Sequence, residues 1–384
     1  MKRKGSIGGR KRSPLLFGIT FRAILVVAAA ALFLSYIAVY VNPSKFSLPL
    51  FFGLYFIPIF ATNLLLLAIA MMRRSASAWI TVVALLPSLL YTELFYKIGH
   101  KENPEVEGIS LKIESYNVGM VSSSGNKLTR EECRKEMAHH LKMESPDIVC
   151  MQEFFVEDRT QADTIFSQYP HRHYHLFKAR NGKLFGNIIL SKFPMGDRGR
   201  ISFPNSTNLS IYADIKHFGR SLRIYNNHLE SYNVSFTALA HKFSNKLEEM
   251  REKEGDIHNA KEESLGGEIT RDIVETHEKM KGTFIKRSEQ VARILDDINS
   301  HSQPAIICGD FNDTPMSFTY HTLAKNRKDT FEEAGKGFGA TFATLWPLLR
   351  IDYILVPQDA GCATHNAQKI SLSDHYPVIS EIII

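Results

Sequence analysis

Acidic residues are absent from the N-terminal part of this sequence. No Asp or Glu occurs between Met1 and Thr92, whereas ten Lys and Arg residues do. Residues 93–384 therefore hold 36 of the 46 basic residues and all 40 acidic ones, a formal charge of −4, although the whole chain carries +6. Excess basic charge is common in nucleic-acid-binding proteins. Here it lies entirely in the N-terminal part and does not indicate a basic binding face elsewhere.

Zinc-binding motifs, repeats and low-complexity tracts are also absent. None of the four cysteines shows the C-x-x-C spacing typical of zinc sites, so a zinc centre has little support. Cys150 and Cys308 lie in apolar, strand-like stretches, where an unpaired cysteine behaves as a small hydrophobic residue. We expect buried thiols, with a disulfide as the alternative in an oxidising compartment.

Long apolar runs occupy the acid-free part. Residues 23–41 carry no charge, and 48–72 form a second run; each is long enough to cross a hydrocarbon core of about 30 Å. A third run, 78–96, is interrupted by Pro87 and Glu93. A cleaved signal peptide has a shorter apolar region that is not followed by further runs. The sequence therefore predicts about three transmembrane helices.

Basic residues flank these runs unevenly. Six lie between Met1 and Arg12, and Arg73-Arg74 follow the second run, whereas only Lys45 separates the first two runs. Positively charged flanks stay on the cytoplasmic side. We expect a multi-pass protein of the cell inner membrane, with the lipid bilayer as a partner, an inside N-terminus and an extracytoplasmic C-terminal domain. No protein partner can be inferred.

The domain boundaries follow from composition. We assign residues 1–98 to the basic tail and membrane region, 99–108 to a polar linker, and 109–384 to an α/β domain in which strand-like runs alternate with amphipathic helices. A highly charged stretch, 238–282, interrupts this domain. Helical arms with a solvated face are the simplest interpretation of it.

Local signals place the first elements of the domain. Residues 111–116 have the pattern of a strand. Thr129 with Glu132 three positions later is a capping box that begins a helix. Residues 147–152 then form an apolar strand, and we expect Glu153 at its carboxyl end.

Two hairpins are predicted in the middle of the domain. Asn181-Gly182 separates strands 173–178 and 186–191, since this dipeptide favours a tight β-turn. Strands 209–216 and 221–227 form the second hairpin. Later strands are expected at 304–308, 351–356 and 376–384.

Polar residues cluster where these strands end, and an α/β scaffold brings strand ends to one crevice. Each cluster alone is more often a turn or cap than a functional site. Together, carboxylates, amides and two histidines suit an oxygen-binding cation and proton transfer at a phosphate ester. The clusters are Tyr116-Asn117, Gln152-Glu153, Asn227-His228-Leu229-Glu230, Gly309-Asp310-Phe311-Asn312-Asp313, Arg350-Ile351-Asp352-Tyr353 and Ser373-Asp374-His375.

This ordered set resembles the endonuclease/exonuclease/phosphatase (deoxyribonuclease I-like) family over residues 111–384. Residues 186–194 and 339–342 are also similar to family segments. The resemblance implies a four-layer α/β sandwich, in which two mixed, mainly antiparallel sheets pack face to face and are flanked by helices. Residues 116–120 lack the Trp-Asn start and the following Arg of many abasic-site enzymes, which disfavours DNA repair.

The resemblance also implies a metal site. By motif, Asn117 and Glu153 would bind the divalent metal, and Asp374 would be a second carboxylate near it. The implied cofactor is Mg²⁺, with Mn²⁺ as an alternative. Whether one or two ions operate stays open.

The remaining motif positions imply catalytic roles. His228 would contact the scissile phosphate, while Asp310 and Asn312 would orient the attacking water and hydrogen-bond the phosphoryl oxygens. Asp352 would hold His375 as a carboxylate holds a catalytic imidazole. The base is either His375 or Asp310, because coupled groups resist a single assignment.

The predicted function is metal-dependent hydrolysis of a phosphate ester by in-line attack of water. The substrate is open between a lipid, a nucleic acid and a small molecule: a phospholipid or sphingomyelin-type phosphodiesterase competes with a DNA or RNA nuclease. The acidic charge of residues 93–384 and their expected extracytoplasmic location favour a non-nucleic substrate. A catalytically inactive membrane-tethered binding or scaffold module is the other alternative, but none of the polar clusters is eroded.

Overall fold

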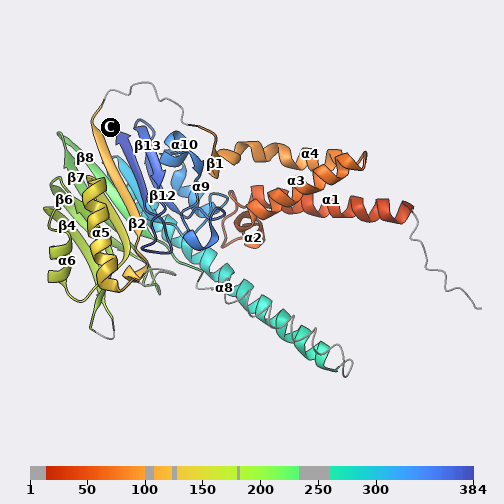
Figure 1. Ribbon diagram of the computed structural model, residues 1–384, viewed down its shortest axis with the longest axis horizontal. Helices are drawn as coiled ribbons and strands as arrows, with labels where there is room; N and C mark the ends of the chain where they lie inside the picture. The colour runs from red at the N-terminus through yellow and green to blue at the C-terminus, as the bar shows by residue number, and fades with distance from the viewer. Residues whose placement is uncertain (1–13, 100–107, 123–127, 180–181, 233–259) are drawn as a thin grey trace, which may run out of the picture.

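The structure is a computed structural model that describes residues 14–99, 108–122, 128–179, 182–232 and 260–384. A layered α/β domain lies at one end of the molecule, and a group of N-terminal helices extends away from it (Figure 1). The predicted linker, the turn residue Asn181 and the first part of the charged insertion lie mainly or wholly outside the described residues.

The first sheet has six strands in the order β13-β14-β2-β3-β5-β4. Its neighbours pair antiparallel except β2 and β3, which are parallel. The strands are β2 (Ser110–Asn117), β3 (Ile148–Val156), β4 (His171–Lys178), β5 (Leu184–Ser191), β13 (Gly361–Ala367) and β14 (Val378–Ile383).

The second sheet also has six strands, in the order β10-β12-β9-β8-β7-β6. Here β8 and β9 are the parallel pair. The predicted hairpin between β7 and β8 is confirmed, and His217 pairs with Arg220 across a two-residue turn. The strands are β6 (Met195–Ser202), β7 (Leu209–His217), β8 (Arg220–His228), β9 (Ala305–Asp310), β10 (Arg327–Asp329) and β12 (Asp352–Pro357).

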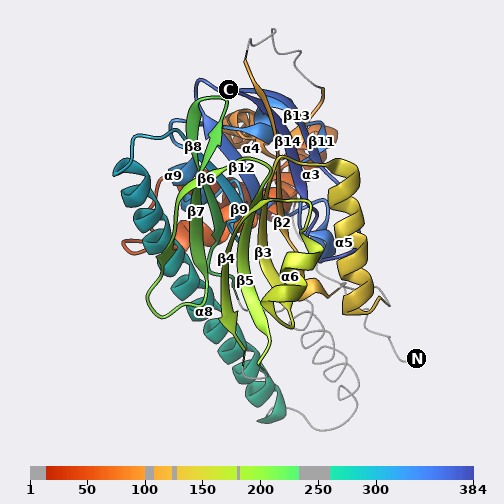
Figure 2. The same cartoon turned by 90° about the vertical axis from the view of Figure 1, so that its left-hand side faces the viewer.

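The two sheets pack face to face, and helices cover their outer faces. Alternate residues of facing strands, such as Ile189 of β5 and Ile306 of β9, share the apolar core between the sheets. The helices α5 (Arg130–Glu144) and α6 (Arg159–Ile165) pack on the first sheet, as Figure 2 shows. Helices α8 (Ala260–Asn299) and α9 (Phe318–Ala324) pack on the second. The predicted α/β sandwich of two mixed sheets is therefore confirmed.

Several local predictions are also borne out. Thr129 caps α5 through the predicted capping box with Glu132. All four cysteines are buried free thiols. The described part of the charged insertion belongs to α8, which extends well beyond the sandwich (Figure 1). Short elements that were not predicted include α10 (Thr330–Ala334) and a small sheet of β1 (Tyr96–Lys97) with β11 (Gly337–Phe338).

The prediction of three membrane-spanning helices is wrong. Within the described residues, one helical stretch, Gly18–Ile37 of α1 (Pro14–Ile37), is long and apolar enough to cross a membrane. The second predicted span is a pair, α2 (Leu48–Leu54) and α3 (Phe56–Met72), bent by 74°. The third is α4 (Ala78–Leu85), which is continued only by short 3₁₀ turns at Leu86–Leu90 and Thr92–Leu94.

A proline residue explains why the second and third predicted spans are each interrupted. A proline within a helix has no N–H to donate, and its ring clashes with the carbonyl four residues earlier. For Pro58 that carbonyl belongs to Leu54, where α2 ends. Pro87 likewise follows the end of α4 by two residues. Nevertheless α1, α3 and α4 lie side by side and point away from the sheets (Figure 1).

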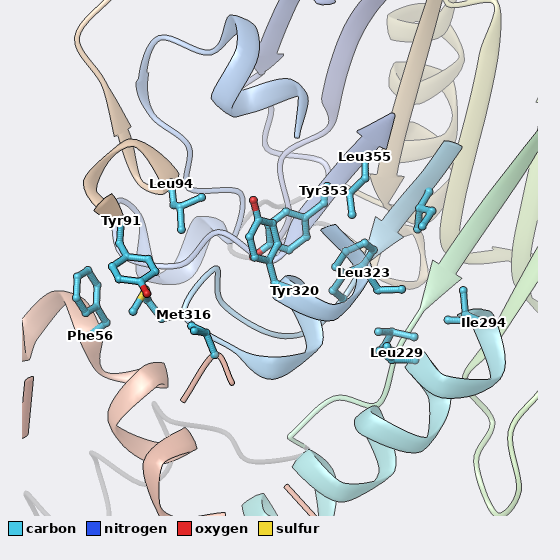
Figure 3. Packing of buried hydrophobic residues seen from close by; sticks show 14 of the residues in the cluster. Phe56, Tyr91, Leu94, Leu229, Ile294, Met316, Tyr320, Leu323, Tyr353 and Leu355 are labelled. Atoms are coloured by element: carbon cyan, nitrogen blue, oxygen red, sulfur yellow. The ribbon is translucent and has the colours of Figure 1, made fainter. Parts of the chain in front are cut away.

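The N-terminal helices are packed onto the α/β domain through a shared apolar core. Phe56 and Tyr91 of the helical region lie in the same cluster as Met316, Tyr320 and Tyr353 of the domain (Figure 3). A side chain added at Gly53 would collide with the carbonyl oxygen of Met316, so α2 approaches the domain as closely as its backbone allows. The guanidinium of Arg350 also donates to the carbonyl of Leu94 at 3.0 Å.

Candidate active site

The predicted site residues lie at one end of the two sheets. Asn117 ends β2, His228 ends β8 and Asp310 ends β9, with His228 and Asp310 paired across the parallel strands. Asp352 begins β12 and pairs with Asp310 from the antiparallel side. His375, in the segment before β14, bridges to Phe342. The fold therefore gathers side chains separated by up to about two hundred and fifty positions of sequence.

Glu153 reaches the site by a different route from the one predicted. The strand does not end there but continues to Val156. The pairing of β3 with β5 shifts between Met151 and Phe154, and Glu153 has a left-handed φ of 54°. A bulge of this kind turns a side chain away from its regular alternation. Its φ is uncommon for a non-glycine residue, and such strain is frequent at functional sites.

Gly309 allows the end of β9 to approach β8. Its φ of 131° lies in a region that side chains rarely adopt, and an added Cβ would collide with the backbone of Asn227. The absence of a side chain thus permits the position of Asp310 next to His228.

Three N–H groups hold the buried carboxylate of Asp310. The Nδ2 atom of Asn117 donates to Oδ2 at 2.9 Å, and Asn312 donates its backbone N–H to Oδ1 at 2.8 Å and its Nδ2 to Oδ2 at 3.0 Å. Burial is the main factor that raises the pKa of Asp310 to about 6, and the Asp352 carboxylate adds to this effect. The network fixes the orientation of Asp310 while leaving a carboxylate able to exchange a proton.

His375 and Asp352 form a buried pair. Nδ1 of His375 lies 2.9 Å from Oδ2 of Asp352, whose backbone N–H donates to Oγ1 of Thr341 at 3.1 Å. Burial opposes protonation of His375, but Asp352 and Asp310 outweigh it and raise its pKa to about 10. Nε2 of His375 is 3.9 Å from Oδ2 of Asp310, which is too long for a hydrogen bond. The imidazole is thus oriented by one carboxylate and directed toward another.

His228 connects this group to Glu153. Its Nε2 is 3.3 Å from Oε1 of Glu153 and 3.9 Å from Oδ2 of Asp310. Asn117 spans the same two carboxylates, since its Nδ2 also donates to Oε1 of Glu153 at 3.3 Å. The Oδ1 atom of Asn117 accepts from the backbone of Gly119 at 3.0 Å. In this conformation the Nδ2 group of Asn117 donates to Glu153 and Asp310, while its oxygen accepts from Gly119.

Two groups of side chains have the chemistry of a metal site. One ligand atom each of Asp310, Asp352 and His375 lies within 4.8 Å of the others. However, His375 uses Nδ1 toward Asp352, and an imidazolium repels a cation. Glu153 and Asp374 instead supply two carboxylates that line the same pocket, and the side chain of Glu153 is 33% exposed. Carboxylate oxygens are the ligands that Mg²⁺ prefers, so this second set fits the ion better.

Arg287 supports the site and was missed by sequence reasoning. This fully buried residue of α8 donates from Nη1 to the carbonyl of Asn312 at 2.7 Å and to that of Glu230 at 3.0 Å. Its Nε lies 3.2 Å from Oδ2 of Asp313. One guanidinium therefore fixes the segment that follows β9, but its position in a charged helix gave no local signal of this role.

The site opens into a pocket of about 740 Å³. Glu153, Asp310, Asn312, Asp374 and His375 line its polar part. The pocket also has an apolar part formed by residues of the N-terminal helices and of the segment before β12. This arrangement can bind an anionic group, hold a cation and move a proton within a partly water-excluded space.

The chain belongs to the Endonuclease/Exonuclease/phosphatase family, whose model matches residues 115–375. Members of this family are phosphoesterase hydrolases that typically use divalent metals. Residues 18–93 match a second model, a Domain of unknown function (DUF8431). A search of curated proteins found no match.

One of the similar solved structures has a TM-score above 0.5 and shares the fold, and two others are similar at lower scores. An endonuclease/exonuclease/phosphatase from Beutenbergia cavernae is 14% identical, with a TM-score of 0.52 and coverage of 72% of each chain. A mannosyl-6-phosphatase from Bacteroides thetaiotaomicron is 15% identical, with a TM-score of 0.48 and coverage of 71% of this chain and 100% of its own. Truncated TDP2 from Caenorhabditis elegans is 18% identical, with a TM-score of 0.46 and coverage of 72% and 98%.

Proposed function

We propose that the protein is a divalent-metal-dependent hydrolase of phosphate esters. The observation that carries the proposal is the convergence of Asp310, the Asp352–His375 pair and Glu153 on one pocket. A phosphate ester is anionic, so attack by water requires a fixed base, donors to the phosphoryl oxygens and neutralisation of charge. Membership of the family supports this reaction class.

Each of these residues has a separate role in the reaction. Asp310 accepts the proton of the attacking water, because three N–H donors fix its carboxylate toward the pocket. His375, held by Asp352, donates from Nε2 to a phosphoryl or leaving-group oxygen. His228 hydrogen-bonds a remaining phosphoryl oxygen, while Asn312 holds Asp310 in place, because its N–H groups donate to Asp310 and to the carbonyl of Leu229. The water oxygen forms the new P–O bond as the opposite P–O bond breaks and its electron pair leaves with the departing alcohol.

Glu153 and Asp374 are the residues that would hold Mg²⁺ or Mn²⁺, with Asn117 orienting Glu153. The bound ion would neutralise negative charge on the phosphate ester. The test is release of p-nitrophenol from bis-p-nitrophenyl phosphate by the full chain. We expect the full chain to release p-nitrophenol, EDTA to abolish this activity, and Mg²⁺ or Mn²⁺ to restore it. The variants Asp310→Ala and His375→Ala should each be inactive. Equal activity of these variants and the unchanged protein would remove the catalytic assignment.

We also propose that the α/β domain lies beside a membrane. Only 22% of the most apolar 18-residue window in Gly18–Ile37 is buried within the protein, unlike the core helix of a soluble protein. The neighbouring helices expose Leu65, Trp79 and Leu90. Such apolar exposure suits contact with lipid. The basic residues before α1 favour an inside N-terminus and an extracytoplasmic domain. A reporter fused after Lys97 should be exported; its retention in the cytoplasm would contradict this orientation.

A further inference from the structure

The pocket has an apolar wall that the proposed chemistry does not use. At the bend between α2 and α3, the pocket is lined by Leu54, Tyr55, Ile57 and Pro58. Further apolar residues come from the segment between β11 and β12. These are Phe342, Leu345, Leu348, Leu349 and Ile351. A phosphate and a water molecule need polar partners, so this wall must serve another part of the substrate.

The size of the pocket leads to the same conclusion. Its volume of about 740 Å³ falls in the range of about 300–1,000 Å³ typical of sites that enclose whole organic ligands. The catalytic side chains occupy only its polar part. The rest offers a largely apolar surface next to the position of the reacting phosphorus.

The apolar lining continues toward the helix that is long enough to cross a membrane. A second cavity, of about 320 Å³, shares Tyr55 and Pro58 with the pocket. Its other lining residues are Ala28 and Ala31 of α1 and Ile59 and Thr62 of α3. Tyr55 and Pro58 are themselves exposed. Tyr55 and Pro58 therefore line both the catalytic pocket and a groove beside α1.

The bend that creates this wall is fixed in place. Because Pro58 interrupts the helix, Leu54 and Tyr55 lie at its break instead of within one continuous α2–α3 helix. Gly53 brings the end of α2 against the carbonyl of Met316, a few residues after Asp310 and Asn312. The wall thus has a set position relative to the catalytic residues.

We infer that the substrate is a phosphate ester of a membrane lipid, with its phosphate at Asp310 and His375 and its hydrocarbon chain against the bend. The inference rests on the proposed function. A nucleic acid is disfavoured because no Lys or Arg is among the residues that line the described pocket, whereas neighbouring phosphates of a polynucleotide require such cations. A lipid needs only one phosphate site and an apolar surface that reaches the bilayer.

The test compares p-nitrophenyl esters of ethyl, octyl and dodecyl phosphate and of thymidine monophosphate. The full chain is assayed with Mg²⁺ in a fixed concentration of nonionic detergent, and kcat/KM is measured from nitrophenol release. We expect kcat/KM to rise about fourfold for each of the first methylenes that become buried. In the double variant Leu345→Ser/Leu348→Ser, the dodecyl-to-ethyl ratio should fall by at least about tenfold. A ratio is unaffected by the fraction of molecules that fold.

Two controls separate this effect from a general loss of surface hydrophobicity. Phe218→Ser alters a 75% exposed residue at the β7–β8 turn, and Met143→Asn alters a 71% exposed residue of α5 outside the pocket lining. Both variants should keep the dodecyl-to-ethyl ratio of the unchanged protein. Equal kcat/KM for all chain lengths, or preference for the thymidine ester, would overturn the lipid inference while leaving the hydrolase in place. If nitrophenol is released from none of the esters, both the proposed function and this inference are overturned.

Discussion

The two walls of the pocket differ in origin and in the way they are held. The polar wall comes from strand ends of the sandwich, where Asp310, Asp352 and His375 are buried and hydrogen-bonded. The apolar wall comes partly from the N-terminal helices, where Tyr55 is 45% exposed. A fixed polar network suits bond breaking, which tolerates little misplacement. A partly open apolar surface suits a chain that must enter from outside.

Because of this difference, we expect the polar wall to set the rate for every ester and the apolar wall to set the preference among esters. A change in the polar wall should alter kcat/KM for all esters by the same factor, because every substrate presents the same phosphate. A change in the apolar wall should alter the ratio between long-chain and short-chain esters. The following substitutions test that division, and each is measured with the ethyl and dodecyl esters.

Glu153→Gln should have the largest effect. The change keeps the shape of the side chain but removes the negative charge expected to bind the ion. We expect kcat/KM to fall by about a hundredfold or more for both esters, and the Mg²⁺ concentration for half-maximal activity to rise by about tenfold or more. A Mg²⁺ titration of the initial rate measures both quantities.

The matched control for this change is Glu157→Gln. Glu157 lies just beyond the same strand, where its side chain is 46% exposed and pairs with Lys183 at 2.7 Å. Its loss should leave the Mg²⁺ titration unchanged, because exposed ion pairs contribute little. An unaltered Mg²⁺ requirement in Glu153→Gln would remove Glu153 from the metal site.

Arg287→Met should have an intermediate effect. The substitution leaves Asp313 buried without its cation and releases the segment of Asn312, so we expect a loss of about 3 kcal/mol in the free energy of unfolding. The kcat/KM should fall by about tenfold, equally for both esters, since a small misplacement of the phosphate site weakens every reaction. Denaturant unfolding and the ester assay provide the two measurements.

Two further variants control for charge and for position. Arg287→Lys keeps the charge but lacks the planar guanidinium that donates to two carbonyls, so it should recover stability more than activity. Lys281→Met alters another residue of α8, which is 44% exposed and pairs with the exposed side chain of Glu278 at 3.4 Å, and should change little. A dodecyl-to-ethyl ratio that shifts in Arg287→Met would show that the polar wall also sets selectivity.

Much of the polar wall could be predicted because its signals are local. Strand patterns end at Asn117, His228 and Asp310, and an α/β scaffold brings the ends of its strands to one crevice. The capping box at Thr129 is equally local. The bulge at Glu153 could not be predicted, since the sequence pattern indicated a strand over residues 147–152 that ends before Glu153, and only the register with β5 reveals the extra residue.

The apolar wall had a signal that was not used. Pro58 lies within the second apolar run and marks the break between α2 and α3. That the break faces the catalytic pocket depends on contacts between Gly53 and Met316, more than two hundred residues apart. The role of Arg287 was hidden for the same reason, because its partners lie in the segments that follow β8 and β9 rather than in its own helix. Such long-range contacts leave no periodic pattern in the sequence.

Gly53→Ala should have the smallest effect on rate but should act on selectivity. The added methyl group collides with the carbonyl of Met316, so α2 must shift, at a cost of about 1–3 kcal/mol in the free energy of unfolding. We expect the dodecyl-to-ethyl ratio to fall by about fourfold for each methylene that loses its contact, with little change for the ethyl ester. Gly282→Ala is the control: a side chain there meets nothing within 4 Å, so it should stabilise α8 by about 0.5–1 kcal/mol and keep the ratio. If Gly53→Ala instead reduced both esters equally, the helical bend would support the catalytic residues rather than select the chain.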